Sequence, residues 1–218
     1  MTRGSTEHLI AALASDAAPV KPLAPPLKRA LATLAGIALV GGIGVYFIAD
    51  LSQLLRRYSG REHMMVLEML AMLMTGALAV TGAFFVSVPG RSRMWLFAPL
   101  PSFLAWIGLS GMGCYAEMIR SGPAGWEIGH SVQCLIFIVA FSVLLGVPLA
   151  WRLSRARPLH SLPVAILGGL GVAAFSAFLL QFFHRSASTF VDLGVHLAAI
   201  ALVVLTTGLF NRRALSPA

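Results

Sequence analysis

Residues Ile128–Trp151 read IGHSVQCLIFIVAFSVLLGVPLAW, a run of 24 residues without Asp, Glu, Lys or Arg. A helix needs about 20 predominantly apolar residues to cross the hydrocarbon core of a bilayer. Near its start the run carries His130 and Cys134, which are four residues apart and therefore share one helical face. The run predicts a membrane-spanning helix that begins with groups suited to redox chemistry or soft-metal binding. A small buried cysteine near a helix-start histidine is the alternative interpretation.

Five further apolar runs, each of 18 to 25 residues, flank this one. They are Ala30–Ala49, Met69–Gly90, Met94–Ala116, Leu159–Phe183 and Leu193–Phe210. The 218-residue chain is 58% hydrophobic and only 11% charged, whereas soluble domains carry about 25% charged residues. Because lipid offers no hydrogen bonds to the backbone, an open chain crosses it as helices. The sequence therefore predicts an all-α integral membrane bundle of six transmembrane helices, embedded in a lipid bilayer.

Prolines and glycines inside the runs predict local features of these helices. Pro99, Pro101 and Pro148 predict kinks. Small residues permit close packing between helices, which is predicted at Gly108, Gly111 and Gly113 in the third run and at Gly168, Gly169 and Gly171 in the fifth.

The expected organisation has three parts. Residues 1–28 form a short cytoplasmic N-terminal tail, residues 29–213 the six-helix transmembrane domain, and residues 214–218 a C-terminal tail. No signal peptide is visible, because a polar, proline-containing stretch precedes the first apolar run, so that run should stay as an anchor.

The tail itself contains a candidate binding element. Ser5-Thr6 can cap a short helix that ends near Ser15 and carries Leu9, Ile10 and Leu13 on one side. Nothing nearby in the sequence would bury this apolar stripe. The tail is therefore either a disordered terminus or a docking segment whose stripe is covered when a partner binds.

Basic residues predict the orientation of the bundle. The loops and tails on the side of both termini carry 11 Lys and Arg, and the opposite loops carry five. The positive-inside rule then places both termini in the cytoplasm. The net charge of +8 comes from short basic clusters between apolar runs, which is the pattern of membrane topology rather than of nucleic-acid binding. Inner arginines could also assist binding to acidic parts of a partner.

This orientation gathers thiols and imidazoles on the outer side of the membrane. Cys114 falls at the outer end of the third helix, and Cys134, His130 and His184 lie near the same face. If the third and fourth helices are neighbours, the two cysteines are at compatible depths for a disulfide, which neither requires nor excludes the bond. Glu68 is an acid within a helix and is interpreted either as functional or as reaching water at the membrane surface.

Several chemistries are not indicated. The chain has no CxxC, P-loop, GxSxG or HExxH motif, and its predicted spans lack the acidic relays of a proton-coupled pump. We therefore expect a protein that is not an enzyme and that has no resident cofactor.

Four segments together resemble the NrsF-like family. They are the tail TEHLIAALASDAAPVKPLAPPLKRA, the loop SVPGRSR, the segment GPAGWEIGHSVQCLIF and the late histidines His184 and His196. Members are six-helix bacterial inner-membrane proteins that negatively regulate an extracytoplasmic-function (ECF) sigma factor. The resemblance implies an anti-sigma factor whose cytoplasmic N-terminal segment, with Leu9, Ile10 and Leu13, holds the sigma factor at the membrane.

The resemblance also implies that outer cysteines sense a metal or oxidative stress. Cys134 matches the family's His-x-x-x-Cys cysteine, but the cysteine expected after His184 is replaced by Arg185. Either Cys114 takes over as the redox partner of Cys134, or sensing relies on a transient soft metal ion, or the protein is a locked variant. Candidate metal ligands are Cys134, His130, His184 and Cys114. The alternative function is a small metal or redox-active membrane transporter that uses the same cluster.

Overall fold

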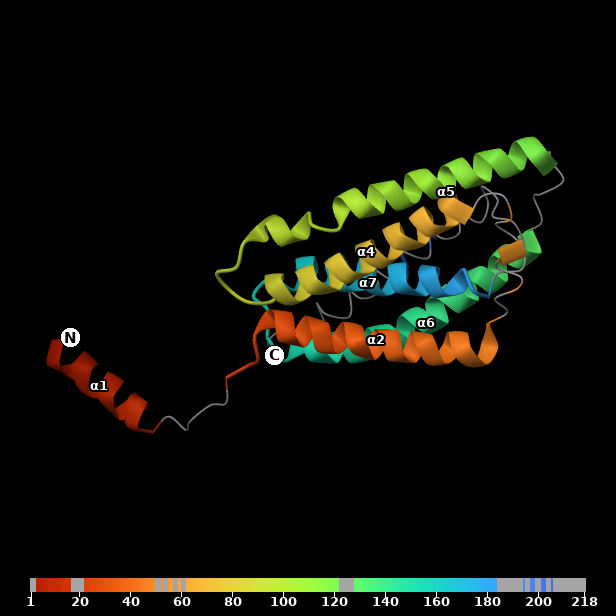
Figure 1. The fold of residues 1–218 in the computed structure, drawn as a ribbon. Helices are drawn as coiled ribbons and strands as arrows, with labels where there is room; N and C mark the ends of the chain where they lie inside the picture. The colour runs from red at the N-terminus through yellow and green to blue at the C-terminus, as the bar shows by residue number, and fades with distance from the viewer. Residues whose placement is uncertain are drawn as a thin grey trace.

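The computed structural model describes residues 3–16, 22–49, 62–121 and 128–183, with a few isolated positions around residues 52–59 and 194–205. In these ranges the elements are α1 (Arg3–Ser15), α2 (Pro26–Ile48), α4 (Glu62–Val86), the 3₁₀ helix η1 (Arg93–Leu96), α5 (Leu100–Ser121), α6 (Ile128–Ser154) and α7 (Ser161–Leu180). No strand occurs there, so the predicted all-α class is confirmed for the described part of the chain (Figure 1).

Five stretches of this structure are long and apolar enough to cross a membrane. They are Pro26–Phe47, His63–Val86, Arg93–Ala116, Leu135–Ser154 and Ser161–Leu180. These stretches correspond to the first five predicted runs and are consistent with a multi-pass membrane protein. The sixth predicted run, Leu193–Phe210, lies outside the described residues, and the count of six stays a prediction.

The third predicted run, Met94–Ala116, forms two helices rather than one. Pro99 disfavours the α conformation at the residue before it. The chain accordingly turns after η1, and α5 begins only at Leu100, where the Phe103 N–H donates to the Pro99 carbonyl at 2.9 Å. The prolines here cause a complete break, whereas the sequence pattern had suggested only a kink.

Helix α7 lies at the centre of the bundle. It packs along α4 on one side and α6 on another, and 72% of its span is buried, against 11% for the span that contains α5. The crossing of α4 and α7 is close because glycines lie at it. A Cβ added to Gly171 would come within 2.7 Å of Val80 Cγ2, and one on Gly76 within 2.9 Å of Phe175 Cε2. The predicted packing role of the glycines in this helix is thus confirmed at Gly171.

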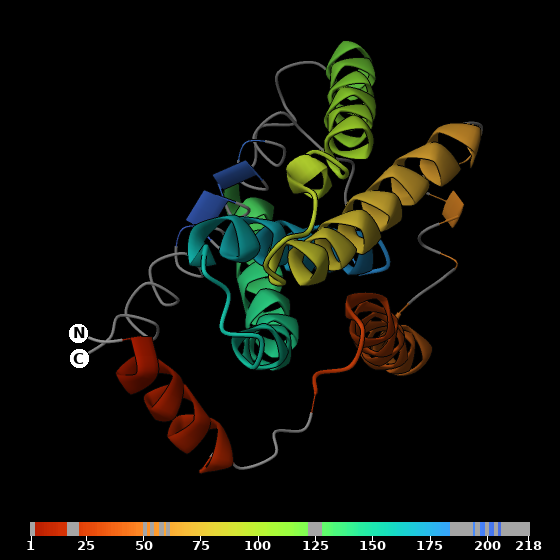
Figure 2. The ribbon, with the colours of Figure 1, turned by 90° about the vertical axis from the view of Figure 1, so that its left-hand side faces the viewer.

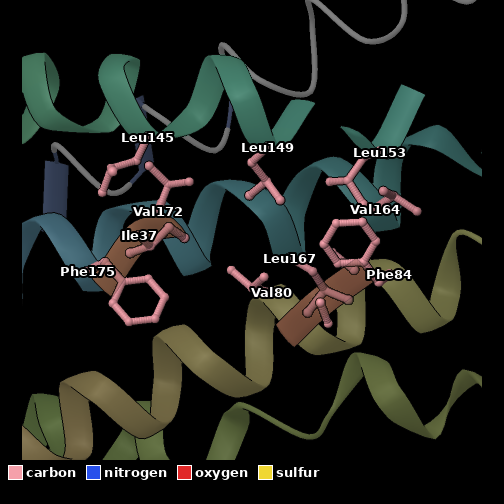
Figure 3. Packing of buried hydrophobic residues seen from close by; sticks show 12 residues of the cluster. Ile37, Val80, Phe84, Leu145, Leu149, Leu153, Val164, Leu167, Val172 and Phe175 are labelled. Carbon is pink, nitrogen blue, oxygen red and sulfur yellow. The ribbon is translucent and has the colours of Figure 1, made fainter. Parts of the chain in front are cut away.

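The main hydrophobic core joins α2, α4, α6 and α7, and Figure 3 shows its side chains converging between these helices. Val80 and Phe84 of α4 meet Leu149 of α6 and Val164 and Val172 of α7, all of them buried. In contrast, α5 packs mainly against α4. Its glycines Gly108, Gly111 and Gly113 have no described neighbour that an added Cβ would touch, so their predicted packing role is not found in the described residues.

The basic loops gather at one end of the bundle. The start of α2, the end of α4 and the start of α7 lie together there (Figure 1). We call this the basic end, and it carries Lys28, Arg29, Arg91, Arg93, Arg152, Arg155 and Arg157. The alternation that the sequence predicted for the first five spans therefore fits the helix course.

Helix α1 is separate from this bundle. Figures 1 and 2 show it standing apart from the other helices, and its side chains from Thr6 to Ser15 are all exposed. It confirms the predicted tail helix and ends where expected, at Ser15. It begins at Arg3, however, so Ser5-Thr6 lie inside the helix and do not cap it.

Candidate functional site

The apolar stripe of α1 is open to the surroundings. Leu9, Ile10 and Leu13 are 60%, 61% and 64% exposed. Their spacing places them on one side of the helix, since residues three and four apart are neighbours on its surface. Exposed apolar side chains arranged in this way are suited to docking into a hydrophobic groove of another protein.

The tail joins the bundle where α2 begins, and this junction is held by an arginine network. Arg29 Nη2 donates to the main-chain carbonyl of Arg152 at 2.6 Å, and Arg152 Nη1 donates to Thr33 Oγ1 at 3.1 Å. The Arg29 guanidinium also lies over the ring of Phe84, 4.9 Å from its centroid. These contacts fasten α2 to α4 and α6. The sequence pattern did not reveal them, because it shows only that arginines flank both helices.

Other basic side chains at the same end rest on aromatic rings. Arg155 lies 3.9 Å from the ring centroid of Trp151, and Arg91 lies 6.0 Å from that of Phe85. Arg93 Nη2 is 3.4 Å from His160 Nε2. The basic end therefore presents cations whose described contacts are with rings, hydroxyls, carbonyls and an imidazole.

The described positions of three thiol and imidazole candidates, Cys114, His130 and Cys134, lie towards the opposite end of the bundle. Cys134 and His130 lie in the first two turns of α6, but their side chains and the whole of His184 are outside the described residues. Cys114 lies in α5 and is buried. Among the described residues no three His, Cys, Asp or Glu side chains form a metal-binding group, and the predicted metal set, which includes undescribed side chains, stays a prediction.

The helix bounds revise the depths of the two cysteines. Because α5 continues to Ser121, Cys114 lies about 10 Å from that helix end, and Cys134 lies about 9 Å from the start of α6. The depths remain similar. However, the described part of α5 packs on α4 and that of α6 packs on α7, so the contacts lend no support to the assumption that α5 and α6 are neighbours.

Towards the end of the bundle opposite the basic end, the contact between α6 and α7 has a regular register. Ser142 Oγ donates to Ser176 Oγ at 3.2 Å, and one turn further Ile138 packs with Leu180 in a second buried cluster. Nearby, the rings of Phe137 and Phe183 have centroids 5.1 Å apart. The two helices are therefore adjacent up to the last described turn of this region.

Glu68, the acid that the sequence placed within a helix, is used between α4 and α5. Ser110 Oγ donates to Glu68 Oε1 at 2.6 Å, and two turns away Thr75 Oγ1 donates to Ser102 Oγ at 3.1 Å. The half-buried carboxylate is thus engaged inside the bundle. A serine in the third predicted run was the only sequence signal for this contact.

Comparisons with known proteins give one match. The family model described as "Negative regulator of sigma F" matches residues 13–216, which is nearly the whole chain. No curated protein and no solved structure matches. The matched segment begins in the last turn of α1, extends beyond α7 and contains the five described helices that are long and apolar enough to cross a membrane, which we call membrane-type helices. On the basis of this match, the chain belongs to the NrsF family of negative regulators of a sigma factor.

Proposed function

We propose that this protein is a membrane-bound anti-sigma factor of the bacterial inner membrane. It sequesters an ECF sigma factor on the cytoplasmic side and releases it when outer Cys and His residues meet an oxidant or a soft metal. The proposal has no catalytic step. Family membership supports the regulatory role, and the observation that carries the mechanism is the exposed stripe of α1, tethered to a membrane-type bundle.

Helix α1 is suited to the partner-binding role because its stripe is covered by nothing in the described chain. Each of its large apolar side chains gains about 1.5–3 kcal/mol when fully buried. Helix α1 and the bundle are joined through a proline-containing segment, Pro22–Pro25, whose side chains are exposed. Such a spacer lets α1 enter a groove on another protein while α2 stays in the bundle.

The test of this role is a double substitution, Leu9→Asp with Leu13→Asp. Because two leucines that the partner would bury are lost, binding of the sigma factor should weaken by about 100-fold or more. Leu23→Asp is the matched control, since Leu23 is 55% exposed and lies outside α1. The measurement is capture of the sigma factor by full-length protein from native membranes. Equal capture by the double variant and the control would move the interface to the basic end.

Uptake of a metal ion by vesicles containing the purified protein would instead favour a transporter.

The sensing role rests on the register of α6 and α7. From the pair Ser142–Ser176 to the pair Ile138–Leu180, the contact moves one turn towards the start of α6 and one turn towards the end of α7. Leu180 is the last residue of α7. If the chain after it keeps the direction of the helix for four more residues, we expect position 134 to face position 184. Cys134 and His184 would then be close enough to share a soft metal ion, with His130 one turn away.

This expectation is tested by restoring the family pattern with Arg185→Cys. A new disulfide with Cys134 should form on mild oxidation, because α6 and α7 are adjacent where they are described. Mass analysis after thiol alkylation detects it. The variant Arg120→Cys is the control, since Arg120 lies on α5. Disulfide formation with Arg120→Cys and not with Arg185→Cys would contradict the register.

Helix α6 offers a route from the sensor to the tail. It contains Cys134 near its start and Arg152 near its end, and Arg152 bonds to the first turns of α2. A shift of α6 would change those bonds and so the position of α2, which follows the tail. The proposed switch is thus a two-state packing of α6 that an outer ligand biases.

A further inference from the structure

Two arginine side chains cross between α2 and α6, and each is hydrogen-bonded to the other helix. Arg29 reaches the carbonyl of Arg152, while Arg152 reaches Thr33, whose own hydroxyl donates to the Arg29 carbonyl at 2.9 Å. Both arginines are half-buried and Thr33 is buried. Both guanidinium groups therefore belong to one hydrogen-bonded, partly desolvated network between α2 and α6.

The bundle supplies no described carboxylate to balance them. After Asp16, the acidic side chains of the chain occur only at Asp50, Glu62, Glu68, Glu117, Glu127 and Asp192. The described helices that carry Glu62, Glu68 and Glu117 place these residues at the end opposite the basic end. Glu7 and Asp16 belong to the tail, and α1 stands apart in Figures 1 and 2. Partial burial of two cations without a described carboxylate is unfavourable, and a bound anion would offset that cost.

The chemistry of the pair fits a phosphate. Arginine presents a planar set of N–H donors that matches phosphate oxygens, and two of them form a stronger site than one. The position fits a lipid phosphate in particular. Arg29 lies in the first turn of one membrane-type helix and Arg152 in the last turn of another, which is the level of the headgroups in a bilayer.

An apolar groove continues from the same side of α2. Ile37 and Gly41 follow Arg29 and Thr33 at intervals of four residues, and both line a groove of about 660 Å³ between α2, α4 and α7. Its other walls include Leu73 of α4, with Phe178 and Leu179 of α7. An acyl chain attached to a headgroup at Arg29 would extend in this direction.

We propose that Arg29 and Arg152 bind the phosphate of an anionic phospholipid, with an acyl chain lying along α2 in the adjoining groove. The site stands independently of the anti-sigma mechanism, because it rests on the contacts of α2 with the bundle. Its occupant would fasten the helix that connects the tail to the transmembrane domain.

The experiment titrates full-length protein in detergent micelles with phosphatidylglycerol or phosphatidylcholine and counts bound lipid by native mass spectrometry. Phosphatidylglycerol should bind preferentially. Arg29→Gln and Arg152→Gln should each weaken its binding by about 10-fold or more, because each removes charge-assisted hydrogen bonds. Lys28→Gln is the matched control, since Lys28 has the same charge and neighbours Arg29 but is exposed. It should weaken binding by less than either arginine variant.

Two further measurements keep the outcome decisive. Arg29→Lys retains the charge without the planar donors, so it should bind phosphatidylglycerol more weakly than the parent protein, a result that can be measured even if Arg29→Gln does not fold. Inorganic phosphate, added at millimolar concentration to protein with bound phosphatidylglycerol, tests whether a soluble anion competes for the site. The proposal is overturned if Lys28→Gln loses as much affinity as Arg29→Gln and Arg152→Gln. It is also overturned if phosphatidylcholine binds as well as phosphatidylglycerol, or if inorganic phosphate displaces the bound phosphatidylglycerol completely.

Discussion

The close crossing of α4 and α7 makes a sharp prediction for Gly171→Ala. The added methyl would lie 2.7 Å from Val80 Cγ2, 3.2 Å from the Val80 nitrogen and 3.3 Å from the Gly76 carbonyl oxygen. Carbon atoms prefer separations of about 3.5–4.0 Å. Val80 is fully buried and β-branched, and the other two contacts are backbone, so relief requires the helices to separate.

The expected cost follows from these contacts. Overpacking costs about 1–3 kcal/mol, and replacing a mid-helix glycine by alanine stabilises a helix by about 0.5–1 kcal/mol, so the net loss of unfolding free energy should be about 0–2.5 kcal/mol. Titration with a denaturing detergent, followed by circular dichroism, measures it. Gly108→Ala is the control, because an added Cβ there meets nothing within 4 Å and should be neutral or stabilising. If Gly171→Ala were as stable as Gly108→Ala, the close crossing would be refuted.

Three other outcomes are expected. Ser110→Ala should lower the unfolding free energy by about 1.5–3 kcal/mol, because it removes a hydrogen bond to the Glu68 carboxylate. Ser154→Ala is the control and should change the unfolding free energy little, because it removes only a bond to the nearby Trp151 carbonyl. Equal effects of the two variants would contradict the role of the α4–α5 contact. Cys134→Ser should blunt the response of a sigma-dependent reporter to an oxidant or soft metal while leaving sigma capture intact, and an unaltered response would leave the thiol a packing group. Topology reporters fused at residue 5 and after Ala218 should read cytoplasmic and one after Gly122 should read outer, and the reverse result would place the thiols on the same side as the sigma factor.

Local sequence patterns predicted the parts of this fold that depend on local physics. Uncharged runs of about 20 residues gave the five described spans, and the spacing of Leu9, Ile10 and Leu13 gave α1. The break before Leu100 was underestimated, because one proline restricts its neighbour without showing how far the chain then turns. The start of α1 was misplaced because Ser5-Thr6 suit a helix cap but do not require one.

Contacts between distant segments were beyond such patterns. Nothing near Arg29 in the sequence indicates that its partner is the carbonyl of Arg152, and nothing near Glu68 points to Ser110 rather than to water. These contacts depend on which helices are adjacent and at what rotation. The same limitation affects the cysteines. The depth of a residue along a helix can be estimated from its number, whereas the residue number does not show which helices are adjacent.

The central position of α7 has a consequence for the order in which the protein is made. Helix α7 is the last of the five described spans to leave the ribosome, yet its Gly171 contacts a segment of α4 synthesised about 95 residues earlier. Until α7 inserts, Gly76 of α4 and Ser142 of α6 must remain in the membrane without their partners in α7. The tail, in contrast, is synthesised before any of them. With the proposed topology, a nascent chain can therefore present α1 to the cytoplasm while its bundle is still incomplete. The capacity to hold a partner would then precede the packing through which the proposed signal must travel.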